Sequence, residues 1–231
     1  MNKYWKDHYN QNSYVFSDSL VKQVGKTVNG KEVGPEQLVC IVDRIAQVLE
    51  LDHTDSIADL CCGNGLITNI VATRVKKVLG FDYSEGLISV AREKNQLGNV
   101  EYMLADVTHL PASQVVDIEK FYMYEALQYF SIEMLQQLLT TLNARKARAL
   151  IFLGSIPDIA RLENYYDTEE KMQFYLERER RNQSHMGKWW SQEELSLAAK
   201  ECGFQARFFN QDHSLYTSGY RFDCLLENID E

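Results

Sequence analysis

The chain has 231 residues, of which 45% are hydrophobic and 25% charged, a composition typical of folded proteins rather than disordered ones. Its 24 Lys and Arg against 33 Asp and Glu give a formal net charge of −9 at pH 7. Because a protein that neutralises many phosphates needs a basic surplus, this charge argues against nucleic acid as a partner. No run approaches the roughly 18 apolar residues of a membrane span, and the start of the chain is too polar for a signal peptide. We therefore expect a soluble, cytoplasmic protein with no membrane partner.

The five cysteines also favour a reducing compartment. Their number is odd and none forms a C-x-x-C pair, so neither a disulfide framework nor a cysteine-based zinc site is predicted. The adjacent Cys61 and Cys62 lie in an apolar run, which is typical of small buried side chains. We predict no bound metal.

In the first half of the chain, short apolar runs typical of buried strands alternate with the three-to-four-residue apolar spacing of helices. A proline at a first helical position, a glycine turn and a serine N-cap mark where the helices begin. On these signals the predicted strands are residues 56–61, 77–82 and 100–104, and the predicted helices are residues 35–49, residues from 66 onward and residues 84–95.

The second half continues this alternation until two strands follow one another without a helix between them. Ser191 and Glu194 form a capping box for a helix that Gly203 closes. The last two strands are joined by a short polar turn, so we expect a terminal hairpin and an antiparallel edge strand. The predicted strands here are residues 119–124, 148–153, 204–209 and 214–226, with a helix whose apolar face begins at Ile132.

Strands separated by helices imply right-handed crossovers and a mostly parallel sheet covered on both faces. We therefore predict an α/β fold with a doubly wound, mostly parallel sheet and an antiparallel last strand. Residues 36–231 form its core, preceded by an aromatic-rich lead of residues 1–35. An insertion at residues 157–190 follows the fifth strand, where open α/β sheets bind ligands, so it is positioned to act as a lid. The alternative is a solvated helical pair at the edge of the sheet.

A glycine turn stands where the first predicted strand, ending in Asp59-Leu60-Cys61-Cys62, turns into a helix. Gly63 and Gly65 remove side chains, so the backbone can approach a ligand closely and adopt a positive φ. Asp82 ends the second strand, and a carboxylate there can accept hydrogen bonds from both ribose hydroxyls of an adenosine. Together the turn and the acidic strand end predict an adenosine-containing ligand.

Two cofactor classes use this arrangement. Nicotinamide and flavin sites prefer a third glycine three positions after the second, where this chain has Thr68, so that class is disfavoured. The Gly25-Lys26-Thr27 sequence is not predicted to be a phosphate-binding loop, because the glycine expected five positions earlier is Leu20 and no strand precedes it.

At these residues the sequence resembles the class I S-adenosylmethionine-dependent methyltransferases. Their first motif, an acidic residue followed by Gly-x-Gly-x-Gly, is matched by Asp59, Cys61, Gly63 and Gly65, with cysteine in place of the first glycine. The resemblance extends over residues 36–226. It implies S-adenosylmethionine as cofactor and a Rossmann-like methyltransferase fold, a seven-stranded sheet whose last strand is inserted antiparallel.

The resemblance also implies roles for later residues and for the lead. Asp82 matches the ribose-binding carboxylate and Tyr83 lies near the adenine, while Asp106 would bond the adenine amino group with the backbone of Val107. In this family a lead such as residues 1–35 often folds over the cofactor; the alternative is an ordinary cap on a sheet edge. The residues predicted to contact the cofactor are Asp59, Cys61, Gly63, Asn64, Gly65, Asp82, Tyr83, Asp106, Val107 and Tyr124.

Methyl transfer from a sulfonium needs an aligned nucleophile, and proximity and orientation can supply up to ~7–11 kcal/mol. An oxygen or ammonium acceptor also needs a general base within hydrogen-bond reach. The predicted catalytic residues are Glu125, which either acts as base or binds a cationic acceptor, His185 in the lid as first candidate base, and Tyr124. Tyr124 is expected to line the cofactor rather than titrate, because an ordinary phenol has a pKa near ~10. The basic run 178–181 is either a solvated face or a binding site for a phosphate or carboxylate.

The leading prediction is therefore methyl transfer to an oxygen or nitrogen of a small-molecule acceptor, such as a sugar or another biosynthetic intermediate. One alternative is a non-catalytic S-adenosylmethionine-binding subunit that stabilises a partner enzyme. Another is a nicotinamide oxidoreductase, against which Thr68 argues. The sequence leaves the acceptor and the oligomeric state open.

Overall fold

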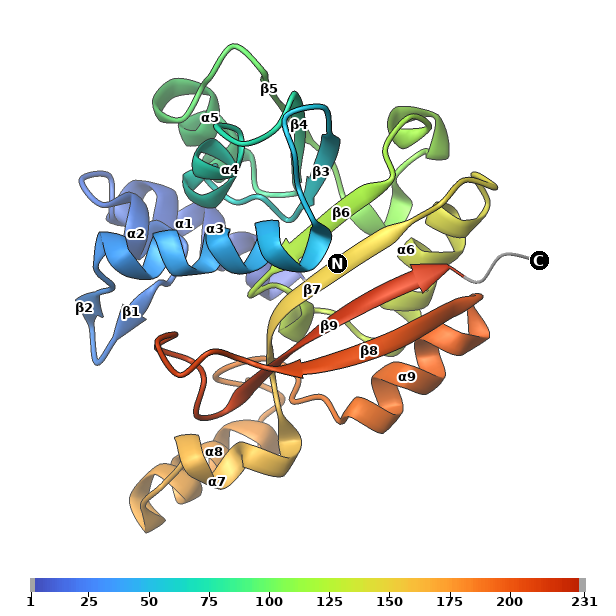
Figure 1. The fold of residues 1–231 in the computed structure, drawn as a ribbon. Coiled ribbons are helices and arrows are strands. Elements are labelled where there is room, and N and C mark those ends of the chain that lie inside the picture. Colours follow the sequence, from blue (N-terminus) through green and yellow to red (C-terminus); the bar gives the residue numbers. More distant parts are fainter. Residues whose placement is uncertain (1–2, 229–231) are drawn as a thin grey trace.

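The computed structural model describes residues 3–228, in which seven strands form one sheet with helices on both faces (Figure 1). The strand order is β5-β4-β3-β6-β7-β9-β8. β9 runs antiparallel to both of its neighbours, and the remaining pairs are parallel. The strands are β3 (Ser56–Leu60), β4 (Lys77–Asp82), β5 (Val100–Leu104), β6 (Lys120–Tyr124), β7 (Leu150–Pro157), β8 (Phe204–Asn210) and β9 (Arg221–Asn228).

Each face of the sheet has its own apolar core, because successive side chains of a strand point to opposite faces. In β6, for example, Phe121 belongs to the core under α6 and α9, whereas Tyr122 belongs to the core under α3, α4 and α5. Serine side chains cap three of these helices, as Ser191 does by accepting the Glu194 backbone N–H at 3.0 Å. The helices are α3 (Pro35–Leu49), α4 (Leu66–Val71), α5 (Glu85–Lys94), α6 (Ile132–Asn143) and α9 (Gln192–Glu201), with short 3-10 helices η1 (Val107–His109), η2 (Ala112–Val115) and η3 (Leu127–Tyr129).

The predicted doubly wound, seven-stranded, mostly parallel sheet with an antiparallel last strand is confirmed. The terminal hairpin is confirmed, as is the inserted last strand that the resemblance implies. The expectation from the strand pattern alone, that the antiparallel strand lies at the edge, is wrong. The crossover through α9 carries β8 one strand beyond β7, and β9 fills the gap between them, so β8 is the edge.

Two strand boundaries also differ from the prediction. β9 begins at Arg221 rather than at 214, because the chain before it leaves the sheet: the Gln37 side chain bonds the backbone of Ser214 (2.8 Å) and Tyr216 (2.9 Å). β7 continues to Pro157 rather than ending at 153, because it pairs with β9 on both sides of an irregularity between Leu153 and Ile156. Both differences lie at the carboxyl end of β7.

The N-terminal segment lies against the loops that follow β3 and β4. Asn10 on α1 accepts hydrogen bonds from the Ser84 hydroxyl (2.7 Å) and the Gly86 backbone N–H (3.1 Å) at the start of α5. The Asn64 side chain donates to the Leu20 carbonyl and the Gln23 side chain on α2, each at 2.8 Å. The elements of this segment are α1 (Lys3–Val15), α2 (Leu20–Gln23) and a hairpin of β1 (Thr27–Val28) and β2 (Lys31–Glu32).

The predicted insertion follows β7 and forms a helical pair that projects beyond the end of the sheet (Figure 1). It contains η4 (Ile159–Arg161), α7 (Leu162–Tyr165) and α8 (Glu169–Arg180), and no residue of α8 is buried. A bridge between Asp158 and Trp190 joins its two ends. None of the helices in residues 3–228 combines the length and apolar character needed to cross a membrane.

Candidate functional site

The loop between β3 and α4 takes a conformation that favours glycine. Gly63 and Gly65 have φ of +57° and +77°, and Cys61 has φ of +72° at the position where the motif usually has its first glycine. A Cβ on Gly65 would lie 2.3 Å from the Tyr102 hydroxyl. The loop therefore needs the two glycines, while Cys61 keeps a glycine-like backbone despite its side chain.

Asp82 lies directly beside this loop at the end of β4. Its Oδ2 accepts the Gly63 backbone N–H and its Oδ1 accepts the Ser84 backbone N–H, each at 2.9 Å. Burial raises the pKa of Asp82 to about 6. The glycine loop and the acidic strand end, 19 positions apart in sequence, are thus brought into contact.

Asp59, on β3 just before the same loop, holds the elements around the loop together. Its Oδ2 accepts hydrogen bonds from the hydroxyls of Thr68 and Tyr122, each at 2.6 Å, and burial raises its pKa to about 7. Thr68, which stands where a dinucleotide site prefers glycine, therefore has a structural partner here. The side chain of Asp59 anchors α4 and β6 to β3.

A cavity with about 710 Å³ of open space lies above this loop. Among the described residues its lining does not include Gly65, Asp106 or Val107. Asp106 instead caps η1, accepting the Thr108 backbone N–H (3.0 Å) and hydroxyl (2.7 Å). The predicted cofactor residues that do line this first cavity are Asp59, Cys61, Gly63, Asn64, Asp82, Tyr83 and Tyr124.

Two of these residues carry unused hydrogen-bonding groups. Within residues 3–228, the buried hydroxyls of Tyr83 and Tyr124 have no hydrogen-bond partner. Burial raises the pKa of both phenols above the ordinary value, so both stay protonated and can donate to a ligand. Asn64 is different, because its side-chain amide holds the N-terminal segment in place.

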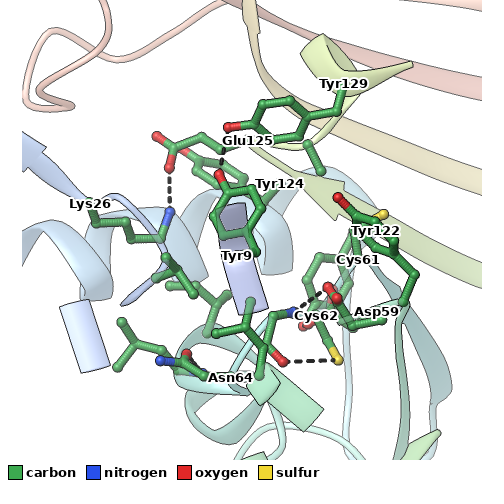
Figure 2. Close-up of a pocket in the computed structure, with 18 of the residues that line it drawn as sticks. Tyr9, Lys26, Asp59, Cys61, Cys62, Asn64, Tyr122, Tyr124, Glu125 and Tyr129 are labelled. Atoms are coloured by element: carbon green, nitrogen blue, oxygen red, sulfur yellow. Dashed lines mark hydrogen bonds and ion pairs between the residues drawn. The ribbon is translucent and has the colours of Figure 1, made fainter. Parts of the chain in front are cut away.

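Lys26 and Glu125 form a buried ion pair at the wall of the first cavity (Figure 2). Glu125 follows β6 with φ of +55°, and its other oxygen accepts the Tyr216 hydroxyl at 2.6 Å. Burial alone would raise the pKa of Glu125, but the charges of Lys26 and Arg221 hold it below its usual value. The Lys26 ammonium also lies 5.1 Å from the centre of the Tyr124 ring.

A second cavity, with about 2210 Å³ of open space, adjoins the first. The two share Tyr9, Val24, Glu125 and Tyr129 in their linings. The hydroxyls of Tyr9 and Tyr129 are hydrogen-bonded at 2.6 Å, and Figure 2 shows Tyr9 pointing toward Tyr129. The rest of the second cavity comes from the N-terminal segment, the insertion and the loop before β9.

His185 lines the second cavity on the side of the insertion. Its Nδ1 lies 3.4 Å from the Tyr166 hydroxyl, and burial together with the charge of Arg178 lowers its pKa. Among the described residues it does not line the first cavity. The basic run 178–181 lines neither cavity in the described part of the chain; Arg178 donates to the Gln183 carbonyl at 2.7 Å instead.

Sequence reasoning missed Lys26, Tyr9 and Arg221. The local sequence around Lys26 resembles only an incomplete phosphate-binding loop, yet Lys26 pairs with a residue 99 positions away. The aromatic density of the lead was a signal for Tyr9, whereas nothing near Arg221 distinguished it from a surface arginine. No group of three or more His, Cys, Asp or Glu within residues 3–228 could hold a metal ion.

The family described as "Methyltransferase domain" matches residues 57–146. The chain is 32% identical over 102 residues to the 23S rRNA (uracil(1939)-C(5))-methyltransferase of Aliivibrio fischeri, a match covering 43% of this chain and 21% of that protein. The chain thus spans only about a fifth of the length of the curated relatives it first matches. These relatives give no support to the expectation that nucleic acid is not a partner.

Two solved structures resemble almost the whole chain. The magnesium protoporphyrin IX methyltransferase of Synechocystis PCC 6803 with bound S-adenosylhomocysteine has a TM-score of 0.66 at 14% identity, over 97% of this chain and 98% of that one. An S-adenosylmethionine-dependent methyltransferase of Anabaena variabilis has a TM-score of 0.64 at 19% identity, over 97% and 93% of the two chains.

The fold is therefore that of the class I S-adenosylmethionine-dependent methyltransferases, as the sequence predicted. Residues 57–146 match the methyltransferase-domain family, and solved structures with this fold hold bound S-adenosylhomocysteine or S-adenosylmethionine. The site suits this cofactor, because the glycine loop leaves room for a close ligand beside Asp82, and Tyr83 and Tyr124 offer unused donors.

Proposed function

We propose that the protein transfers the methyl group of S-adenosylmethionine to an oxygen or nitrogen of a small molecule. The observation that carries this proposal is the pair of adjoining cavities. The first is built around the glycine loop and Asp82, and the second is a larger space with aromatic walls. They meet at Tyr9, Glu125 and Tyr129, where a bound acceptor would face the cofactor.

In this proposal Asp82 accepts hydrogen bonds from the ribose hydroxyls, and the Gly63 backbone lies under the adenosine. Tyr83 serves the adenine end, and Tyr124 serves the methionine end. When bound, the cofactor supplies an electrophilic methyl group on a positively charged sulfur. An aromatic face such as that of Tyr124 can stabilise a cation by about 0.5–2 kcal/mol.

Of the two candidate bases, His185 suits proton removal better than Glu125. Lys26 and Tyr216 already engage the two oxygens of Glu125, and a carboxylate with a lowered pKa is a weak base. His185 is neutral at pH 7 because its pKa is lowered, so one ring nitrogen can accept a proton. We therefore assign Glu125 a structural role in the wall between the two cavities. His185 is assigned the role of general base for the acceptor in the second cavity.

RNA methylation is a second candidate, favoured by the names of the curated relatives. Against it stand the net charge of −9 and the aromatic, partly enclosed second cavity, which suits a small molecule better than a polymer.

The test is transfer of label from tritiated S-adenosylmethionine. The full chain is incubated with a panel of phenols, amines, sugars and carboxylic acids, and separately with total ribosomal RNA and tRNA. We expect label in at least one small molecule, and none with Asp82→Ala. Label in RNA alone would favour the second candidate. Cofactor binding without any transfer would favour a non-catalytic subunit and overturn the proposal.

A further inference from the structure

Arg221, the first residue of β9, lines the second cavity and is only 6% exposed. Its Nη1 donates to the Ser155 carbonyl at 2.6 Å. The Nε of the same guanidinium is buried and, within residues 3–228, has no hydrogen-bond partner. Because an arginine side chain stays protonated in proteins, this is a buried charge with an unmet donor.

The other buried charges near Arg221 are already paired. Lys26 pairs with Glu125, and Asp223 pairs with Arg44 at 2.9 Å. Among the described carboxylates none forms an ion pair with Arg221. The cluster at the carboxyl ends of β6 and β7 and the start of β9 therefore carries one positive charge without an ion-pair partner among the described residues, beside the Tyr220 ring, whose centre is 5.5 Å from the guanidinium. A buried charge of this kind is unfavourable unless something pairs with it.

The backbone around Arg221 is held in an unusual conformation. Ser155 on β7 and Glu125, directly after β6, have φ of +60° and +55°, a region that side-chain-bearing residues rarely adopt. The conformation of Ser155 accompanies the β7 irregularity that brings its carbonyl to Arg221. Strained positions of this kind gather at ligand sites, because the surrounding structure must hold them there.

Two further features of the second cavity indicate what kind of ligand would pair with Arg221. The rings of Tyr165, Tyr166 and Tyr220 line it, with centroids of adjacent rings 4.8 and 4.9 Å apart, and offer flat apolar surface. The Oε1 of Gln128, also in the lining, is buried and lacks a donor among the described residues. A ligand that satisfies both polar groups carries one anionic group and one N–H or O–H.

We propose that the methyl acceptor is a flat, largely apolar carboxylic acid with an N–H or O–H group, whose carboxylate pairs with Arg221; this inference rests on the proposed function. A carboxylate supplies the single negative charge that the cluster lacks and the planar oxygen pair that a guanidinium binds well. A phosphate dianion suits the site less well, because its second negative charge would be repelled by the Glu125 carboxylate.

The test compares matched acid and amide probes that differ in charge but hardly in shape. The pairs are 4-hydroxybenzoate with 4-hydroxybenzamide, and indole-3-acetate with indole-3-acetamide. Binding to the full chain saturated with S-adenosylhomocysteine is measured by calorimetry. We expect the acid of at least one pair to bind about tenfold tighter or more, the effect of one hydrogen-bonded charge, and inorganic phosphate not to compete.

Arg221→Met should reduce this preference to within twofold, and Arg221→Lys should keep part of it. Lys171→Met is the matched control, because Lys171 lines the same cavity but is exposed and paired with Asp167, so the full preference should remain. Circular dichroism checks that each variant is folded. If Arg221→Met does not fold, the acid preference of the wild type and of Arg221→Lys tests the inference instead.

No preference for the acid in any pair, including no binding of either member, overturns the inference. So does a preference that survives in folded Arg221→Met, or one that Arg221→Lys leaves unchanged. The proposed function fails separately, through absence of methyl transfer while the acid preference remains. Transfer to neutral acceptors only, with no acid preference, would overturn this inference and leave the proposed function standing.

Discussion

Two buried carboxylates at the ends of neighbouring strands have different partners and, we propose, different roles. Asp59 is bonded by two protein hydroxyls, so its place in the fold is structural. Among the described residues, Asp82 is bonded only by backbone N–H groups of the loops beside it, an arrangement that fixes the carboxylate while leaving lone pairs for a ligand. The contrast separates a residue that supports the cofactor loop from one that would bind the cofactor.

Asp82→Asn should weaken S-adenosylhomocysteine binding by about 10- to 100-fold. The amide keeps the shape of the side chain but loses the charge and one acceptor, and a charge-assisted hydrogen bond is worth about 1.5–3 kcal/mol. Titration calorimetry measures the effect. Glu85→Gln, an exposed acid three residues away, is the control and should bind like the wild type. Equal affinity for Asp82→Asn and wild type would rule out the ribose role.

Lys26→Met should destabilise the protein by about 3–5 kcal/mol, because it leaves the Glu125 carboxylate buried without its partner. Chemical denaturation measures the loss. The double variant Lys26→Met with Glu125→Gln removes both charges and should recover much of the stability. If the single variant is as stable as the wild type, the ion pair does not hold the N-terminal segment against β6.

At the scale of elements, the cofactor loop depends on its tight backbone. Gly65→Ala forces a side chain into a left-handed position and brings its Cβ within 2.3 Å of the Tyr102 hydroxyl. We expect a loss of stability of at least about 1–3 kcal/mol and weaker cofactor binding. Gly98→Ala is the control, since its Cβ would meet nothing within 4 Å. Similar melting temperatures and affinities for the two variants would show that the loop tolerates a side chain.

Most elements could be predicted from the sequence because their signals are local. The apolar spacing of α3, the serine caps and the turn Gly63-Asn64-Gly65 each act within a few residues. The start of β9 could not be predicted, because the aromatic run around Tyr216 looks like a strand but bonds Gln37 and Glu125 instead.

The candidate site divides in the same way. The glycine loop and Asp82 follow from a motif, whereas Lys26 and Arg221 take their roles from partners far along the chain. Their surroundings arise only when β6, β7 and the N-terminal segment come together. The acceptor side was for this reason much less predictable than the cofactor side.

For the whole molecule, the raised pKa values of Asp59 (about 7) and Asp82 (about 6) make stability depend on pH. In the unfolded chain both ionise near the ordinary value of 3.8, so between pH 4 and 7 the folded state holds more protons. The free energy of unfolding should therefore fall as the pH rises through this range. With about 1.4 kcal/mol per pKa unit, the rise of the Asp59 pKa from 3.8 to about 7 corresponds to a decrease on the order of 4 kcal/mol.

Asp59→Asn isolates this effect, because an amide does not titrate. Urea denaturation at pH 5 and pH 8 should show a smaller decrease for Asp59→Asn than for the wild type. The control is Glu133→Gln, which removes an exposed carboxyl whose pKa is lowered by the Ser131 hydroxyl. Its free energy of unfolding should fall between pH 5 and pH 8 at least as much as that of the wild type. A wild-type decrease that Asp59→Asn leaves intact would mean that Asp59 ionises normally in the folded protein.

The N-terminal segment and the insertion contribute to the cavity walls from parts of the chain that are far apart in sequence. The first contributes Tyr9, Val24 and Lys26 to the cavity walls, and the second contributes Tyr165 and His185. A cap at residues 1–35 and a lid at residues 157–190 stay predictions, and both agree with this placement.

The central claim is that the glycine loop and Asp82 hold the adenosine of S-adenosylmethionine. A crystal structure with S-adenosylhomocysteine tests it most directly. The account predicts ribose hydroxyls within hydrogen-bond distance of the Asp82 carboxylate and the sulfur directed toward the second cavity. A ligand bound elsewhere, with Asp82 touching no part of it, would contradict the account.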